Sequence, residues 1–86
     1  MQIVGTERFI IYGFEGCHYC SSAIELLESA GYEYIFIPLD EGSRALREVK
    51  RAYAWSTAPI ILAKQDIGSY ILIGGFSDLK EMLDFR

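Results

Sequence analysis

Two cysteines, three positions apart, stand where a predicted strand passes into a predicted helix. The run FIIYGF at residues 9–14 is apolar and aromatic apart from Gly13, which is typical of a strand buried on both faces. After it, apolar residues recur at spacings of three and four, which predicts a helix that packs on this strand and ends at Gly31. The predicted apolar stripe consists of Cys20, Ala23, Ile24, Leu27 and Ala30. The Cys17–Cys20 pair therefore lies at a strand-to-helix junction.

The middle of the chain continues with a strand and a second helix. The run YEYIFIP at residues 32–38 is rich in β-branched and aromatic residues, which predicts a strand joined to the first one by a right-handed parallel crossover. The run SRALREVKRAYAW at residues 43–55 predicts a helix with Ser43 as its N-cap. Its apolar face is expected to hold Ala45, Leu46, Val49, Ala52 and Tyr53.

The last third predicts a hairpin and a final helix. Two apolar strands at residues 59–63 and 70–74 flank the turn-forming run KQDIGS, so they must pair antiparallel. Ser77 or Asp78 is then expected to cap a helix, with Glu81 completing a capping box. The apolar residues of that helix are Leu79, Met82, Leu83 and Phe85. The predicted order is strand, helix, strand, helix, strand, strand, helix.

Composition indicates one globular domain over residues 1–86. The net charge of −4 argues against nucleic acid as the main partner, although Arg44, Arg47, Lys50 and Arg51 form a local basic group that faces water or an anion. The sequence shows neither a signal-peptide pattern nor an apolar run of the ~20 residues that a membrane span needs. We therefore expect a cytoplasmic protein that acts on no membrane and is a monomer by default.

The cysteine pair has three interpretations: half of a zinc site, a permanent disulfide, or a redox couple. A structural zinc site takes four protein ligands, whereas this chain offers two cysteines and one histidine, so no metal site is expected. A reducing cytosol disfavours a permanent disulfide. The third interpretation fits helix geometry, because the N–H groups of a first helical turn favour a thiolate at Cys17 while Cys20 lies in the apolar stripe. Cys17 would attack and Cys20 would resolve, with His18 tuning the thiolate.

Three separated motifs resemble the glutaredoxin family. CHYC stands where the family commonly has Cys-Pro-Tyr-Cys, TAP at residues 57–59 where it has Thr-Val-Pro, and GGFSDL at residues 74–79 where it has Gly-Gly-x-Asp/Thr-Asp-Leu. They come in family order and span essentially the whole chain. The resemblance implies an α/β, thioredoxin-like fold, with a four-stranded mixed sheet and helices on both faces. It further implies a glutathione-dependent thiol-disulfide oxidoreductase of the dithiol class, with glutathione as co-substrate and no tightly bound cofactor.

The resemblance also assigns roles to individual residues. Cys17 and Cys20 would be the catalytic pair, Pro59 a cis-proline beside them, and Ala58 would pair its backbone with the cysteine of glutathione. The γ-glutamyl end would meet the start of the last helix, where its ammonium suits the Asp78 carboxylate. The full set implied to bind glutathione is Tyr19, Thr57, Ala58, Pro59, Gly75, Ser77 and Asp78. Implied partners are disulfide-containing or glutathionylated proteins, with ribonucleotide reductase as a candidate.

One departure from the family pattern and one dipeptide near the TAP motif keep other functions open. Many members carry Lys or Arg where this chain has Phe14, and acidic Glu15 follows. Trp55-Ser56 before the TAP motif favours an alternative, a glutaredoxin-like donor that thioredoxin reductase reduces. A third hypothesis is a non-enzymatic module that binds zinc or an iron-sulfur cluster between two chains.

Overall fold

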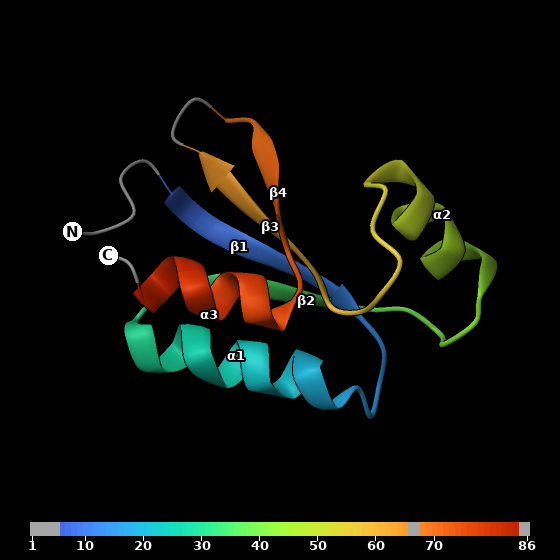
Figure 1. Ribbon diagram of the computed structural model, residues 1–86, viewed down its shortest axis with the longest axis horizontal. Coiled ribbons are helices and arrows are strands. Elements are labelled where there is room, and N and C mark those ends of the chain that lie inside the picture. The colour runs from blue at the N-terminus through green and yellow to red at the C-terminus, as the bar shows by residue number, and fades with distance from the viewer. Residues whose placement is uncertain (1–5, 66–67, 85–86) are drawn as a thin grey trace.

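The computed structural model describes residues 6–65 and 68–84, and these residues form four strands and three helices (Figure 1). The elements are β1 (Thr6–Gly13), α1 (His18–Ala30), β2 (Tyr34–Pro38), α2 (Arg44–Ala52), β3 (Ile60–Gln65), β4 (Tyr70–Gly74) and α3 (Phe76–Asp84). This order confirms the order predicted from the sequence. Phe85, predicted for the last helix, lies outside the described residues.

The four strands form one mixed sheet in the order β2-β1-β3-β4. β1 pairs parallel with β2, as the predicted crossover requires, and antiparallel with β3, which pairs antiparallel with β4. β1 and β3 are the two central strands, and both read as continuous apolar runs. Residues 60–63 of β3 are all buried, whereas in β1 the buried Phe9 and Ile11 alternate with the half-buried Ile10 and Tyr12. The predicted burial of the first strand on both faces therefore holds only in part. The four-stranded mixed sheet is confirmed.

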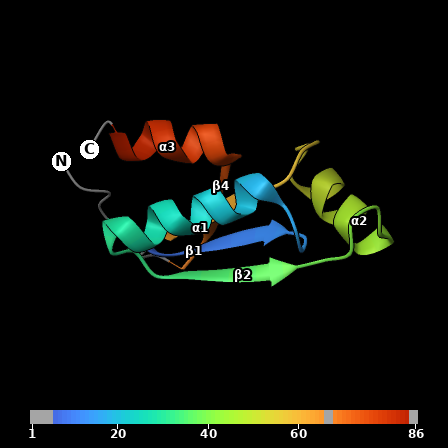
Figure 2. The same ribbon diagram turned by 90° about the horizontal axis from the view of Figure 1, so that it is seen from below.

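One face of the sheet carries the main core beneath α1 and α3. Figure 2 shows both helices on the same side of β1 and β2. The buried side chains of this core are Phe9 and Ile11 from β1, Ile61 and Ala63 from β3, Ala23 and Leu27 from α1, and Leu79 and Leu83 from α3. The apolar stripes predicted for the two helices thus face the sheet, except that Ala30, at the end of α1, is exposed. This packing fixes the N-terminus of α1 relative to β1.

The α2 helix lies apart from this core, beyond the ends of β1 and β2 (Figures 1 and 2). It buries Leu46 and contacts β1. Of the predicted apolar face, Ala45 and Ala52 are exposed and Val49 and Tyr53 are half-buried, so only Leu46 of this face reaches the interior. The reason is that a helix docked at the end of a sheet inserts one side chain rather than a full stripe. Ser43 is the N-cap as predicted, since its Oγ accepts the Leu46 N–H at 3.1 Å.

Local geometry sets the ends of the other elements. Gly31 takes the left-handed conformation at φ 81°, and the N–H of Tyr32 returns to the carbonyl of Leu27, so β2 begins at Tyr34 rather than at residue 32. The last helix begins at Phe76, which makes the predicted N-cap at Ser77 or Asp78 wrong. Both residues lie in its first turn, and Asp78 reaches back to accept the N–H of Gly75 at 2.9 Å.

Candidate active site

The chain turns sharply between β1 and α1 and presents Cys17 at the start of the helix. Gly16 adopts φ 83°, a left-handed conformation that glycine takes without strain, and the N–H of Cys17 bonds to the carbonyl of Phe14 at 3.1 Å. Cys17 is the N-cap of α1, and its Sγ accepts the backbone N–H of Cys20 at 3.2 Å. No acidic residue lies in the first turn. This sulfur therefore meets the positive end of the helix dipole without a competing carboxylate on that turn.

Cys17 and Cys20 are joined in a disulfide, with 5.2 Å between their Cα atoms. Both are buried, at 6% and 2% residual exposure, so a reacting partner reaches them only along the surface beside the helix start. One helical turn thus holds both sulfurs within bonding reach, which is what a reversible dithiol requires.

A groove reaches the disulfide region through Tyr19, which stands between the two cysteines, although neither cysteine lines it. The groove has a volume of about 340 Å³, and its lining residues are Tyr19, Trp55, Thr57, Ala58, Pro59, Gly75, Phe76, Ser77 and Asp78. The structure thus brings together, from three separate segments, all seven residues that the family resemblance assigned to glutathione. His18 is exposed and does not line this groove.

The floor of the groove is the segment that leads from α2 into β3. The Ala58–Pro59 peptide bond is cis, as the resemblance implied, and Pro59 is buried while Thr57 is exposed. Within residues 6–65 and 68–84, the backbone N–H and C=O of Ala58 form no hydrogen bond. They are free to pair with an extended peptide-like ligand, as one strand pairs with another.

The wall of the groove is the start of α3. The N–H of Gly75 is held by Asp78 Oδ2, and the Gly75 Cα approaches both Pro59 and Trp55, since a Cβ placed there would lie 3.7 Å from the Pro59 carbonyl oxygen and from Trp55 Nε1. Asp78 also brings a carboxylate to the groove. The N-terminus of α3 and this carboxylate offer sites for a carboxylate and an ammonium group, respectively.

Sequence reasoning missed two residues of the groove. Phe76 stacks on Tyr19 with ring centroids 6.0 Å apart, which links α3 to the turn between the cysteines. Trp55 lines the groove, and its Nε1 is buried with no hydrogen-bond partner among the described residues. The available signal was position alone, because Trp55 lies two residues before the TAP motif and Phe76 lies inside GGFSDL.

No helix in the described part of the chain is long and apolar enough to cross a membrane. Among the same residues, no group of three or more His, Cys, Asp or Glu side chains is arranged to hold a metal ion.

Comparison with known families identifies the fold and the chemistry. The glutaredoxin family model matches residues 9–67, which is most of the chain. The chain belongs to the glutaredoxin family. A search of curated proteins found no match for this glutaredoxin.

Solved structures agree with the assignment. This glutaredoxin is similar to the solution structure of a glutaredoxin from Brucella melitensis, with a TM-score of 0.66 and 29% identity over 98% of this chain and 86% of that one. It also shares its fold with a thioredoxin-fold protein from Helicobacter pylori, with a TM-score of 0.52 and 14% identity over 95% of this chain and 73% of that one. The thioredoxin-like fold is confirmed, and family and cysteine pair together support thiol-disulfide oxidoreductase activity.

Proposed function

We propose that this glutaredoxin uses glutathione to reduce protein disulfides and glutathionylated proteins in the cytoplasm. The observation that carries the proposal is one groove that both the free backbone pair at Ala58 and the helix start with Asp78 line, together with Tyr19 from between the two cysteines. A tripeptide with one ammonium group and two carboxylates matches those features. Ribonucleotide reductase is a candidate target under this proposal.

Glutathione would lie extended across the cis-proline segment. Its cysteine residue would pair with the N–H and C=O of Ala58, which points its sulfur toward Cys17. Its γ-glutamyl carboxylate would meet the N–H groups at the start of α3, and the ammonium group would meet Asp78. Tyr19 would cover the ligand from the side, since the residue is 61% exposed and its ring already stacks on Phe76.

Reduction of a glutathionylated protein needs one reactive cysteine. The Cys17 thiolate attacks the glutathione sulfur of the mixed disulfide, that S–S bond breaks, and the protein thiolate leaves and takes up a proton. Cys17 is then disulfide-bonded to glutathione. The thiolate of a second glutathione attacks the bound glutathione sulfur, which releases glutathione disulfide and restores the Cys17 thiolate. One free glutathione is thus oxidised: its sulfur forms a disulfide with the glutathione sulfur taken from the substrate, and the protein thiol is regenerated.

Reduction of a protein disulfide uses both cysteines. Cys17 attacks one sulfur of the substrate, and Cys20 then attacks Cys17, which releases the reduced protein and forms the Cys17–Cys20 disulfide seen here. Two glutathione molecules reduce that disulfide in turn.

A second candidate function keeps the thiol-disulfide exchange at Cys17 and Cys20 but replaces glutathione with thioredoxin reductase as the reductant. Phe14 and Glu15 place no cation before Cys17, and Trp55-Ser56 precedes the TAP motif, which favours recycling by thioredoxin reductase. Asp78 in the groove favours glutathione.

Two coupled assays with the purified protein separate the candidates. The first supplies a small mixed disulfide of glutathione, free glutathione, glutathione reductase and NADPH, and the second supplies thioredoxin reductase, NADPH and a protein disulfide. We expect NADPH oxidation in the first assay. Turnover in the second assay alone would overturn glutathione dependence and leave the oxidoreductase assignment intact.

A further inference from the structure

The α2 helix carries a basic surface formed by Arg47, Lys50 and Arg51. These positions are three and four residues apart, so the three side chains lie on one face of the helix. With Ala54, Trp55 and Ser56 they line one open groove, here called the basic groove. A basic groove on a protein of net charge −4 is a local reversal of sign.

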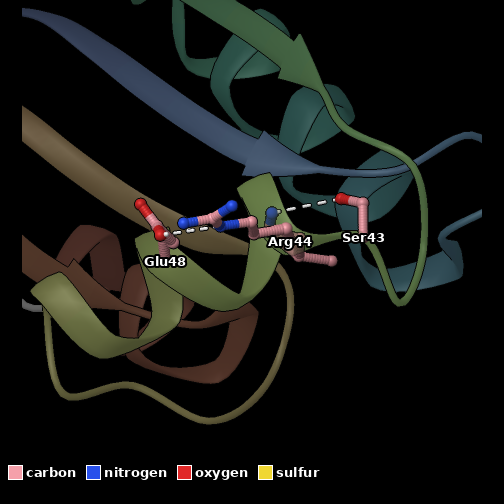
Figure 3. A network of polar contacts seen from close by, with 4 residues as sticks. Ser43, Arg44 and Glu48 are labelled. Carbon is pink, nitrogen blue, oxygen red and sulfur yellow. Dashed lines mark hydrogen bonds and ion pairs between the residues drawn. The ribbon is translucent and has the colours of Figure 1, made fainter.

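Within residues 6–65 and 68–84, no acidic side chain forms an ion pair with a cation of the basic groove. Figure 3 shows that Glu48, the acidic residue of α2, pairs instead with Arg44 at 3.3 Å. Arg47 donates to the Gly42 carbonyl at 2.6 Å, a bond that leaves its positive charge uncompensated. The side chains of Lys50 and Arg51 form no ion pair or hydrogen bond with any described residue.

Stability alone explains this arrangement only in part. Lys50 and Arg51 lie in the last turn of α2, where cations favour the helix dipole. Arg47 and Arg51 are like charges four residues apart, a spacing that costs a helix a few tenths of a kcal/mol. The repulsion between these cations is a cost to the helix, and binding of an external anionic partner would explain why all three lie on one face.

The basic groove continues into the active-site groove. Trp55 lines both, with the TAP segment on one side and Lys50 and Arg51 on the other. Both views of the molecule place α2 at the same end as the N-terminus of α1, where Cys17 lies (Figures 1 and 2). A chain segment that delivers its cysteine to Cys17 can therefore extend over Trp55 onto α2.

We propose that the basic groove docks an acidic segment of the substrate protein next to its reactive cysteine. The inference rests on the proposed function and adds the substrate class, namely targets whose disulfide or glutathionylated cysteine is flanked by several Asp or Glu residues. Three cations on one face exceed what a single carboxylate needs, and they match a short run of carboxylates. Such pairs mainly raise the association rate and the selectivity, and salt screens them.

A binding measurement tests the docking without relying on the redox chemistry. Two labelled peptides, both with serine in place of the reactive cysteine, carry either four Glu or four Gln residues beside it. Fluorescence anisotropy follows their binding at low and high salt. We expect the protein to bind the Glu peptide about tenfold more tightly than the Gln peptide at low ionic strength, and within about twofold of it at 0.5 M salt.

Two matched variants locate the effect. Lys50→Gln/Arg51→Gln removes two positive charges from the basic groove, and Arg8→Gln/Lys80→Gln removes two positive charges from β1 and α3. We expect the first variant to lose the preference for the Glu peptide and the second to keep it. An equal loss in both variants would reduce the effect to net charge and overturn the proposal. A short DNA oligonucleotide that binds more tightly than the Glu peptide would overturn it as well.

Kinetics then link docking to catalysis and separate it from glutathione binding. With glutathionylated peptides, Lys50→Gln/Arg51→Gln should lower kcat/KM about tenfold for the Glu peptide, while the small mixed disulfide of glutathione is turned over as before. An equal loss for the small substrate would show that these cations hold glutathione itself, which contradicts the proposal. If no substrate is turned over with glutathione, the proposed function fails, whereas the anisotropy result still decides the docking.

Discussion

Gly13 and Cys20 lie so close together that a Cβ atom at position 13 would overlap Cys20 Sγ. Gly13 ends β1, and Cys20 lies one turn into α1, so the absence of a side chain at the strand end makes room for the buried sulfur of the redox pair. The φ of Gly13 is not in the left-handed region, which leaves space as the reason for glycine here.

Gly13→Ala should therefore destabilise the oxidised protein by about 1–3 kcal/mol, the usual cost of overpacking a core. Urea unfolding of the oxidised protein measures this change. In a Cys20→Ala background the clash partner is gone, so the same substitution should cost much less. An equal cost in both backgrounds would contradict the assigned contact.

The sequence predicts the order of helices and strands because the apolar residues of each helix recur every three or four positions and those of each strand form a short run. It does not predict where α2 docks. Ala45 and Ala52 lie on the apolar side of the helix and are nevertheless exposed, since only Leu46 reaches the interior. Helical periodicity identifies the apolar face of a helix, but it does not show how much of that face another element covers.

The sequence pattern predicts the first residue of α3 too late, for a different reason. An Asp near a helix start can be an N-cap or an N3 residue that reaches back, and both give the same local sequence pattern. In the structure Asp78 reaches back to Gly75. The groove roles of Trp55 and Phe76 depend on three segments meeting in space, which no local pattern encodes.

Asp78 has two separable roles, in the helix start and in the proposed glutathione site. Asp78→Ala removes the acceptor of the Gly75 N–H and should lower the free energy of unfolding by about 1 kcal/mol. Asp78→Asn keeps an acceptor oxygen and should lose less stability, yet both variants should raise KM for glutathione because the carboxylate is gone. Glu81→Gln, an exposed position on the same helix, is the control. Unchanged KM in both Asp78 variants would argue against the ammonium contact.

Ala54 is the one non-glycine residue of the described chain with a positive φ, at 52°. A left-handed conformation costs an L-residue about 1–2 kcal/mol, and glycine avoids this at an entropic cost of about 0.5–1 kcal/mol. Ala54→Gly should therefore stabilise the protein by about 0.5–1 kcal/mol in urea unfolding. Ala52→Gly, within α2 and also exposed, should destabilise it by about 1 kcal/mol. The same sign for both substitutions would contradict the strain at Ala54.

Tyr34 has a raised pKa because its hydroxyl donates a 2.6 Å hydrogen bond to Glu28 Oε2, with burial and the Glu28 charge adding to the shift. Folding thus favours the neutral phenol, so this stabilisation is complete below the unfolded pKa near 10 and is lost as pH rises through the folded pKa. The difference in unfolding free energy between wild type and Tyr34→Phe should therefore be larger at about pH 8 than at about pH 11. A difference that grows with pH would contradict the assigned hydrogen bond.

The most direct test of the account is the site at which glutathione becomes attached. Each single cysteine variant is treated with glutathione disulfide, and the products are mapped by mass spectrometry. Cys20→Ser should take up one glutathione on Cys17, release it to free glutathione and retain deglutathionylation activity. Cys17→Ser should be inactive because its remaining thiol, Cys20, lies inside α1 and not at the N-cap position that favours a thiolate. An active Cys17→Ser, or a Cys20→Ser that never carries glutathione on Cys17, would contradict the assignment of Cys17 as the glutathione-reactive nucleophile.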